Sequence, residues 1–76
     1  MNHMIAAEQA LALASQEFTR QGMDVQTYEI MLDEKLSKGD FWMIWYDKKG
    51  PFPIPGGKHL VRVSKATGEA VFMKGE

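Results

Sequence analysis

The sequence contains no cysteine, so disulfides and thiolate metal sites are excluded. Two histidines, His3 and His59, cannot complete a zinc site without carboxylates or a second chain. A chain of 76 residues forms one domain, residues 1–76, which buries only about 60% of its unfolded surface. Association with a second chain is then the remaining ordinary source of stability. We therefore expect a homodimer, with no metal and no other cofactor.

Long hydrophobic runs are absent as well. The longest is Phe41–Tyr46, far short of the roughly 20 residues that a membrane-spanning helix needs. The N-terminus has no basic stretch followed by an apolar core, so no secretory signal is visible. The net charge of −1 gives no support for nucleic-acid binding. These absences predict a cytoplasmic protein that binds neither membrane nor nucleic acid.

The charge is unevenly distributed along the chain. Residues 1–47 carry three basic and eight acidic side chains, whereas residues 48–76 carry six basic and two acidic ones. Such asymmetry can steer a partner. Alternatively, acidic and basic strands lie beside one another in a sheet and screen each other.

Catalytic signatures are also missing. The chain has no G-x-S-x-G, no Walker A sequence and no G-x-G-x-x-G. Pro55-Gly56-Gly57-Lys58 precedes a predicted strand, whereas a phosphate loop needs a helix N-terminus. Asp33 and Glu34 are adjacent and would point to opposite faces of a strand, which does not suit an acid–base pair. We expect no catalytic residues and a protein that is not an enzyme.

The first predicted element is a helix over residues 4–20. Apolar side chains recur there at spacings of three and four, at Met4, Ala7, Leu11, Ala14 and Phe18. Gly22 follows as a helix stop, because glycine readily adopts the left-handed conformation that ends a helix. The small alanines would let this helix lie close to a sheet.

Residues 24–38 allow two interpretations. In the first they form a helix that Asp24 caps and Gly39 ends. In the second a strand over 26–33 alternates apolar and polar side chains, with Val25 out of phase. We favour the strand, because Thr27, Tyr28 and Ile30 are good strand formers.

Phe41–Tyr46 predicts a central strand, over residues 40–47, that is apolar on both faces. Prolines and glycines then predict a loop over 48–57. Alternation predicts two further strands, over 58–65 and 69–74, joined by a turn at Gly68. The fold class is therefore α+β, with one N-terminal helix packed on a four-stranded antiparallel sheet in the order α-β-β-β-β.

One helix covers only one face of such a sheet, so the other face should be an apolar interface. Our first hypothesis is a non-enzymatic protein-binding module that self-associates through this face. The predicted binding residues are Trp42, Ile44, Tyr46, Phe52 and Arg62. Trp45 competes with Trp42, since the sequence does not show which face is open.

Two other hypotheses remain. A small-ligand binder or minor enzyme would use a pocket between helix and sheet, with His59 and Tyr28 as its polar groups. A structural fragment of a larger protein would expose core residues at its chain ends.

Trp45-Tyr46, the Pro/Gly loop and the closing segment Leu60–Val71, with Thr67-Gly68 at its turn, resemble small bacterial domains of the cystatin-like and nuclear-transport-factor-2-like type. Among these are the YrhB-like immunity proteins of polymorphic toxin systems and, more distantly, PepSY-type modules. The resemblance covers about residues 5–73. It implies a helix on a bent sheet, and it implies binding, such as neutralisation of a toxin or another enzyme, in place of catalysis.

Overall fold

The computed structural model describes residues 4–50 and 57–73. Its elements are the helix α1, two short 3₁₀ helices, η1 and η2, and four strands. In chain order they are α1 (Ala7–Arg20), η1 (Val25–Thr27), β1 (Tyr28–Leu32), η2 (Leu36–Lys38), β2 (Phe41–Lys48), β3 (Lys58–Ser64) and β4 (Ala70–Met73).

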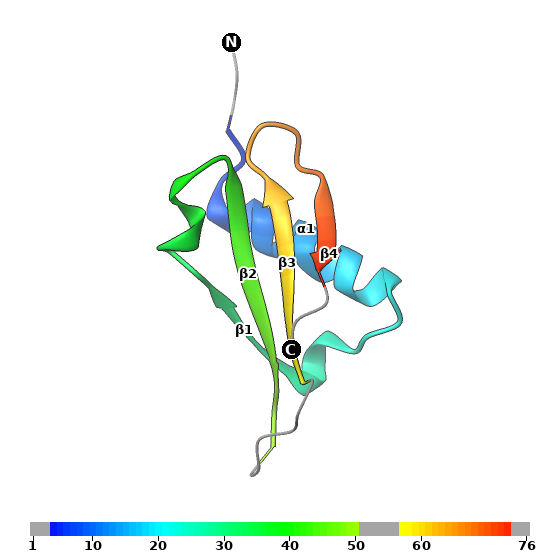
Figure 1. Ribbon diagram of the computed structural model, residues 1–76. Coiled ribbons are helices and arrows are strands. Elements are labelled where there is room, and N and C mark those ends of the chain that lie inside the picture. The colour runs from blue at the N-terminus through cyan, green and yellow to red at the C-terminus, as the bar shows by residue number, and fades with distance from the viewer. Residues whose placement is uncertain (1–3, 51–56, 74–76) are drawn as a thin grey trace.

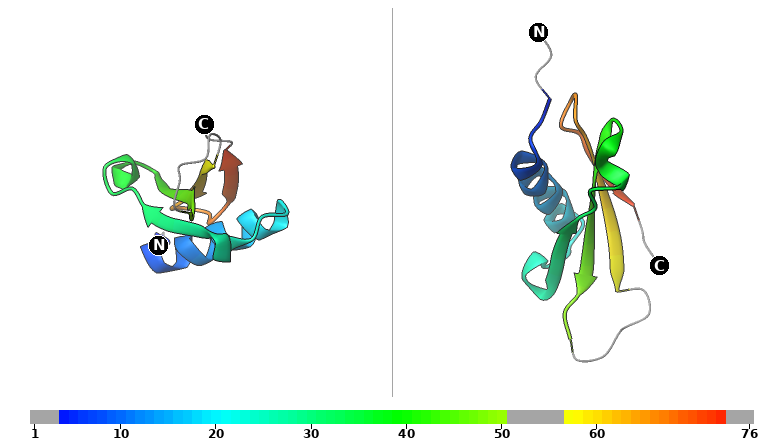
Figure 2. Two further views of the ribbon diagram at one scale, coloured as in Figure 1. Left: turned by 90° about the horizontal axis from the view of Figure 1, so that it is seen from below. Right: turned by 90° about the vertical axis from the view of Figure 1, so that its left-hand side faces the viewer.

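The four strands form one antiparallel sheet in the order β1-β2-β3-β4. Helix α1 lies across one face of this sheet, behind β2, β3 and β4 in the view of Figure 1. The side view shows the same two layers, with the helix on one side and the strands on the other (Figure 2). The predicted fold class, a helix on a four-stranded antiparallel sheet, is confirmed.

Helix α1 begins at Ala7, three residues later than the sequence pattern indicated. The residues before it are extended, because the backbone N–H of Ile5 donates a 2.8 Å hydrogen bond to the carbonyl of Lys65 in the β3–β4 turn. The helix ends before Gly22, whose φ of 89° is left-handed. That glycine terminates the helix as the sequence predicted.

The ambiguous segment combines features of both interpretations. Asp24 caps a helical turn, since its Oδ1 accepts a 3.0 Å hydrogen bond from the backbone N–H of Gln26, but the turn is the 3₁₀ helix η1 and ends at Thr27. Strand β1 starts only at Tyr28. The 3₁₀ turn therefore explains why Val25 is out of phase with the strand pattern.

The core lies between α1 and the sheet. The ring of Phe18 stacks on Tyr46 with centroids 4.1 Å apart, and the ring of Tyr28 meets Phe18 edge-on at 4.9 Å. Ala10 and Ala14 are fully buried, and their small side chains let the helix approach the strands. Burial of these aromatic rings supplies much of the hydrophobic stabilisation available to a chain of this size.

Candidate functional site: the open face of the sheet

The two faces of the sheet have different cover. Ile44, Tyr46, Val61 and Val63 point to α1 and are fully buried. The alternate residues point the other way, where no helix of residues 4–50 and 57–73 covers them. We call this surface the open face; the register places on it Glu29, Met31, Phe41, Met43, Trp45, Asp47, Lys58, Leu60, Arg62, Ser64, Val71 and Met73.

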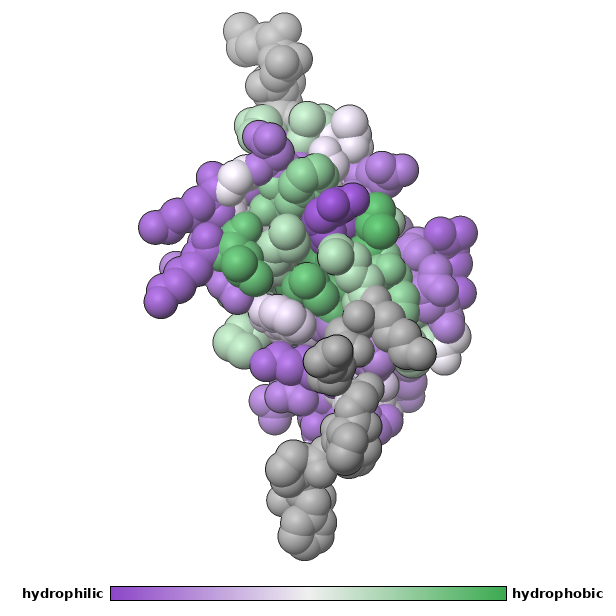
Figure 3. Space-filling model, viewed as in Figure 1, coloured by the Kyte–Doolittle hydropathy of each residue, from purple (hydrophilic) through white to green (hydrophobic). Residues whose placement is uncertain are grey.

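Figure 3 looks onto the open face and shows a central apolar area bordered by hydrophilic side chains. Met31 is 58% exposed and Met73 39% exposed, while Trp45 and Leu60 are half-buried by their neighbours. A contiguous apolar area with a polar rim is the usual anatomy of a protein interface.

The predicted binding residues divide between the two faces. Arg62 lies on the open face. Ile44 and Tyr46 have no exposed surface, because they lie beneath α1. Phe52 lies outside the described residues. Of the two competing tryptophans, Trp45 is the one on the open face.

Trp42 has a structural role on the covered side. Its indole Nε1 donates a 2.7 Å hydrogen bond to the carbonyl of Ile5, just before α1. The ammonium group of Lys65 lies 4.4 Å from the centre of its ring. These contacts attach the segment before the helix to the end of β2.

Arg62 is the most unusual residue of the open face. Its guanidinium carbon lies 4.4 Å from the centre of the Phe41 ring, so the cation rests on an aromatic face. Its Nε is buried and has no hydrogen-bond partner among the residues that the structure describes. The ion pair found in the described ranges, Arg20 with Glu17, is on the helix and leaves Arg62 without a carboxylate. A buried donor of this kind is satisfied in proteins by ordered water or by a polar group of another molecule.

Trp45 is fixed from two sides. Its Nε1 donates a 3.1 Å hydrogen bond to Oδ2 of Asp33, and the ammonium group of Lys58 lies 5.0 Å from its ring centre. Oδ1 of Asp33 accepts a 3.1 Å hydrogen bond from the backbone N–H of Leu36. These hydrogen bonds hold the pKa of the Asp33 carboxyl below its ordinary value. The bond from the Leu36 N–H has the larger effect, and the bond from the Trp45 indole has the next largest.

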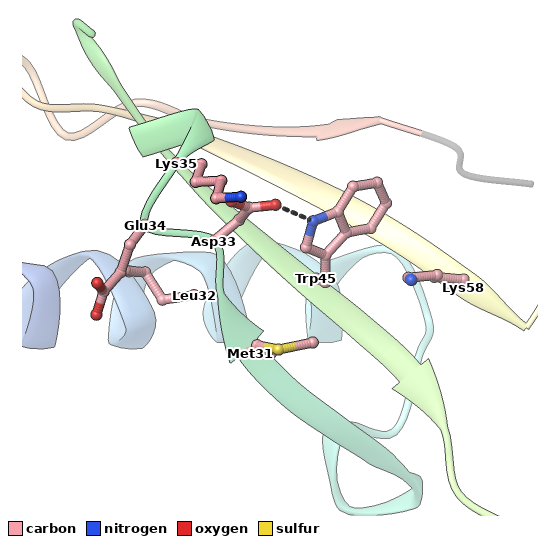
Figure 4. A pocket seen from close by; sticks show the side chains of 7 residues that line it. All are labelled: Met31, Leu32, Asp33, Glu34, Lys35, Trp45 and Lys58. Carbon is pink, nitrogen blue, oxygen red and sulfur yellow. Dashed lines mark hydrogen bonds between the residues drawn. The ribbon is translucent and has the colours of Figure 1, made fainter. Parts of the chain in front are cut away.

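Beside Trp45 the surface is hollowed. Figure 4 shows this hollow of about 420 Å³, with the indole ring as one wall and Met31, Asp33 and Lys58 around it. Glu34 and Lys35 add one charge of each sign. An apolar wall with charged groups at its margin suits a protruding apolar side chain of another polypeptide.

The second hypothesis needs a cavity between helix and sheet. In that layer the rings of Tyr28 and His59 pack against Phe18 with centroids at 4.9 and 5.8 Å, and Phe72 packs on His59 at 5.5 Å. These rings fill the space around Tyr28 and His59. A smaller hollow of about 210 Å³ lies at the edge between α1 and β4, where Leu13, Glu17 and Ala70 are among its lining residues. The hollow beside Trp45 is on the open face.

Sequence reasoning named Trp45 only as a competitor and did not select Met43, Leu60, Val71 or Met73. Strand alternation was the available signal, because it groups Trp45 with Phe41 and Met43 and Leu60 with Arg62. Strand alternation does not give the register between neighbouring strands, which decides the residues that share a face.

A scan against protein-family models finds no match, and searches of the curated proteins and of the solved structures find none either. The structure agrees with the resemblance proposed above only at the level of a small α+β fold, one N-terminal helix on a four-stranded antiparallel sheet. Among residues 4–50 and 57–73, no helix is long and apolar enough to cross a membrane. Within the same ranges, no three His, Asp or Glu side chains gather as metal ligands would.

Proposed function

We propose that this protein is a non-enzymatic binding module whose open face docks on another polypeptide. The observation that carries the proposal is the position of Arg62, a cation inside an apolar area whose buried Nε has no hydrogen-bond partner among the described residues. Arginine and aromatic side chains that become desolvated together are the usual hot spots of protein interfaces. An inhibitor or an immunity protein would use such a face in the same way, so that role is one form of the proposal.

The exposed apolar side chains of the open face would supply hydrophobic binding energy. Methionines are flexible and polarisable, and they adapt to a partner surface. Met31 and Met73 are among the most exposed large apolar residues of the described chain. Each such side chain contributes roughly 1.5–3 kcal/mol when a partner buries it fully, less what is already buried.

Neighbouring residues of β1 allow a matched test. Met31 and Ile30 are 58% and 43% exposed, but Met31 points to the open face whereas Ile30 points to the helix side. A photoreactive amino acid placed at either position samples one face only. We expect position 31 to form a discrete crosslinked species in cells that make the chain, and position 30 to form none.

The mass of the crosslinked species then identifies what lies on the face. Twice the chain mass indicates a second copy, and any other mass indicates a different protein. Circular dichroism of both labelled chains controls for folding. Equal crosslinking from both positions, or none from position 31, would contradict the proposed function.

A further inference from the structure

The charges of the open face are arranged in rows across the sheet. The register aligns Glu29 with Asp47 and Asp47 with Lys58, and it aligns Met31 with Trp45 and Trp45 with Leu60. A third row continues the pattern just beyond β1. There the backbone N–H of Asp33 donates a 2.8 Å hydrogen bond to the carbonyl of Met43, and Met43 is aligned with Arg62.

The outer members of these rows are complementary. Along the β1 side they run acid, methionine, acid, at Glu29, Met31 and Asp33. Along β3 they run base, leucine, base, at Lys58, Leu60 and Arg62. Strand β2 lies between the two series, and neighbouring strands are about 4.8 Å apart. The two series are therefore roughly 10 Å apart within one chain, and none of these four charged residues forms an ion pair among the described residues.

We infer that the open face binds a second copy of this chain, related by a two-fold axis that runs along β2. The inference rests on the proposed function and names its partner. Such an axis places the β1 side of each copy over β3 of the other, so that Glu29 faces Lys58, Met31 faces Leu60 and Asp33 faces Arg62. Every one of these contacts then occurs twice.

Charge disfavours a two-fold axis perpendicular to the strands. A two-fold axis perpendicular to the strands would lay each strand on its own copy with the rows reversed. Arg62 would then face Lys58, and Glu29 would face Asp33, so like charges would meet in both places. An axis between β2 and β3 would place Asp47 over Lys58, but it would leave Arg62 opposite Met43, whereas the axis along β2 gives Arg62 a carboxylate.

This arrangement also supplies the acceptor that Arg62 lacks. The Asp33 carboxylate accepts hydrogen bonds from the Leu36 N–H and the Trp45 indole, and a carboxylate has further lone pairs that a guanidinium can use. The second copy's Leu60 reaches Met31, beside the hollow at Trp45. Asp47 of one copy faces Asp47 of the second copy at the axis. Both carboxylates are exposed to solvent, and each is aligned with Lys58 of its own chain.

The size of the face sets the expected affinity. About this axis β1, β2 and β3 of the two copies overlap while β4 of each copy lies outside, so the shared area is on the order of 400 Å² in projection. Stable interfaces bury about 800 Å² per partner. We therefore expect a dimer with a dissociation constant in the micromolar range, which sedimentation equilibrium measures directly.

Charge reversal tests the pairing. One variant carries Lys58→Glu with Arg62→Glu, and the other carries Glu29→Lys with Asp33→Lys. Each variant alone would place like charges together, so its self-association should weaken roughly 100-fold. Mixed together, the two variants make every pair attractive again, and they should form a heterodimer within about tenfold of the wild-type affinity. Glu8→Lys, an exposed change at the start of α1, is the control and should leave the dimer unchanged.

Folding of the variants is checked by circular dichroism. Asp33→Lys removes two hydrogen bonds, so the simpler pair Lys58→Glu and Glu29→Lys decides the matter if the double variant does not fold. A heterodimer that forms only on mixing supports the inference. A wild-type dimer that is insensitive to all of these reversals overturns it.

A monomeric wild type also overturns the inference, and the crosslinking experiment then separates the two proposals. If position 31 captures a different protein while the purified chain stays monomeric, the open face binds but not a second copy. If position 31 captures nothing, the proposed function fails with it.

Discussion

Trp42 and Ile5 are joined by a hydrogen bond that ties the start of the chain to its central strand. The indole Nε1 of Trp42 donates to the Ile5 carbonyl at 2.7 Å, and the Ile5 N–H donates to the Lys65 carbonyl at 2.8 Å. Both polar groups of the Ile5 backbone are thereby satisfied in a half-buried position. The segment before α1 is thus fixed on both sides, by β2 and by the β3–β4 turn.

The first prediction concerns this bond. Trp42→Phe keeps an aromatic ring but removes the donor, so the Ile5 carbonyl loses its partner. We expect the free energy of unfolding to fall by about 1–3 kcal/mol, the cost of an unsatisfied, partly buried carbonyl together with lost ring area. Urea denaturation followed by circular dichroism measures it. An unchanged midpoint would show that the bond contributes nothing to stability.

The second prediction concerns Gly68 in the β3–β4 turn. Its φ is 82°, and a Cβ placed there would lie 2.6 Å from Cδ1 of Ile5 and 3.4 Å from Cδ1 of Leu13. Gly68→Ala therefore combines left-handed strain, about 1–2 kcal/mol, with a clash. We expect a clear fall in the thermal midpoint. Gly22→Ala is the matched control, because its φ of 89° is similar but no atom lies within 4 Å of the added Cβ. Equal losses in the two variants would exclude the clash.

The fold class followed from periodicity, whereas the choice of open face did not. Alternation separates Trp42, Ile44 and Tyr46 from Phe41, Met43 and Trp45 with certainty. Both sets are apolar and aromatic, so hydropathy cannot decide which set meets the helix. That decision depends on how the connection from α1 to β1 places the helix, and hydropathy carries no information about it.

The existence of an apolar open face was predictable from the sequence, but the set of residues on it was not. Arg62 was selected from its residue type and lies on the open face. The complementary series on β1 and β3 could not be seen, because a shift of register by one residue moves every side chain to the other face. Asp33 is the clearest example. Alternation alone does not align it with Arg62, whereas its backbone bond to Met43 in the structure does.

The third prediction concerns Tyr46 at alkaline pH. Burial raises the pKa of its phenol above the ordinary value of 10.0, although the hydrogen bond with Ser15, 3.0 Å long, acts in the opposite direction. The folded state therefore favours the neutral phenol. Its contribution to stability is complete below pH 10 and is lost as the pH rises above that value.

Denaturant unfolding between pH 8 and pH 11 measures this loss. Tyr46→Phe removes the ionisable group, so the stability of the variant should depend less on pH in that range than the wild type does. At neutral pH the variant should lose about 0.5–1.5 kcal/mol through the missing Ser15 bond. Tyr28→Phe, at a half-buried ring, is the comparison. Identical pH profiles for wild type and Tyr46→Phe would contradict the prediction.

The fourth prediction concerns Asp33 at acid pH. Hydrogen bonds from the Leu36 N–H and from the Trp45 indole lower the pKa of its carboxyl from the ordinary value of 3.8. A lowered pKa means that the charged form stabilises the folded state, so this contribution is present above pH 3.8 and is lost as the pH falls through the lower folded value. Asp33→Asn should therefore be less stable than the wild type at pH 7, and the difference should narrow toward pH 2. Tryptophan fluorescence reports the titration of Asp33, because protonation of its carboxylate weakens the hydrogen bond to Trp45. A stability difference between wild type and Asp33→Asn that stays constant with pH would show that the carboxylate charge is not the stabilising element.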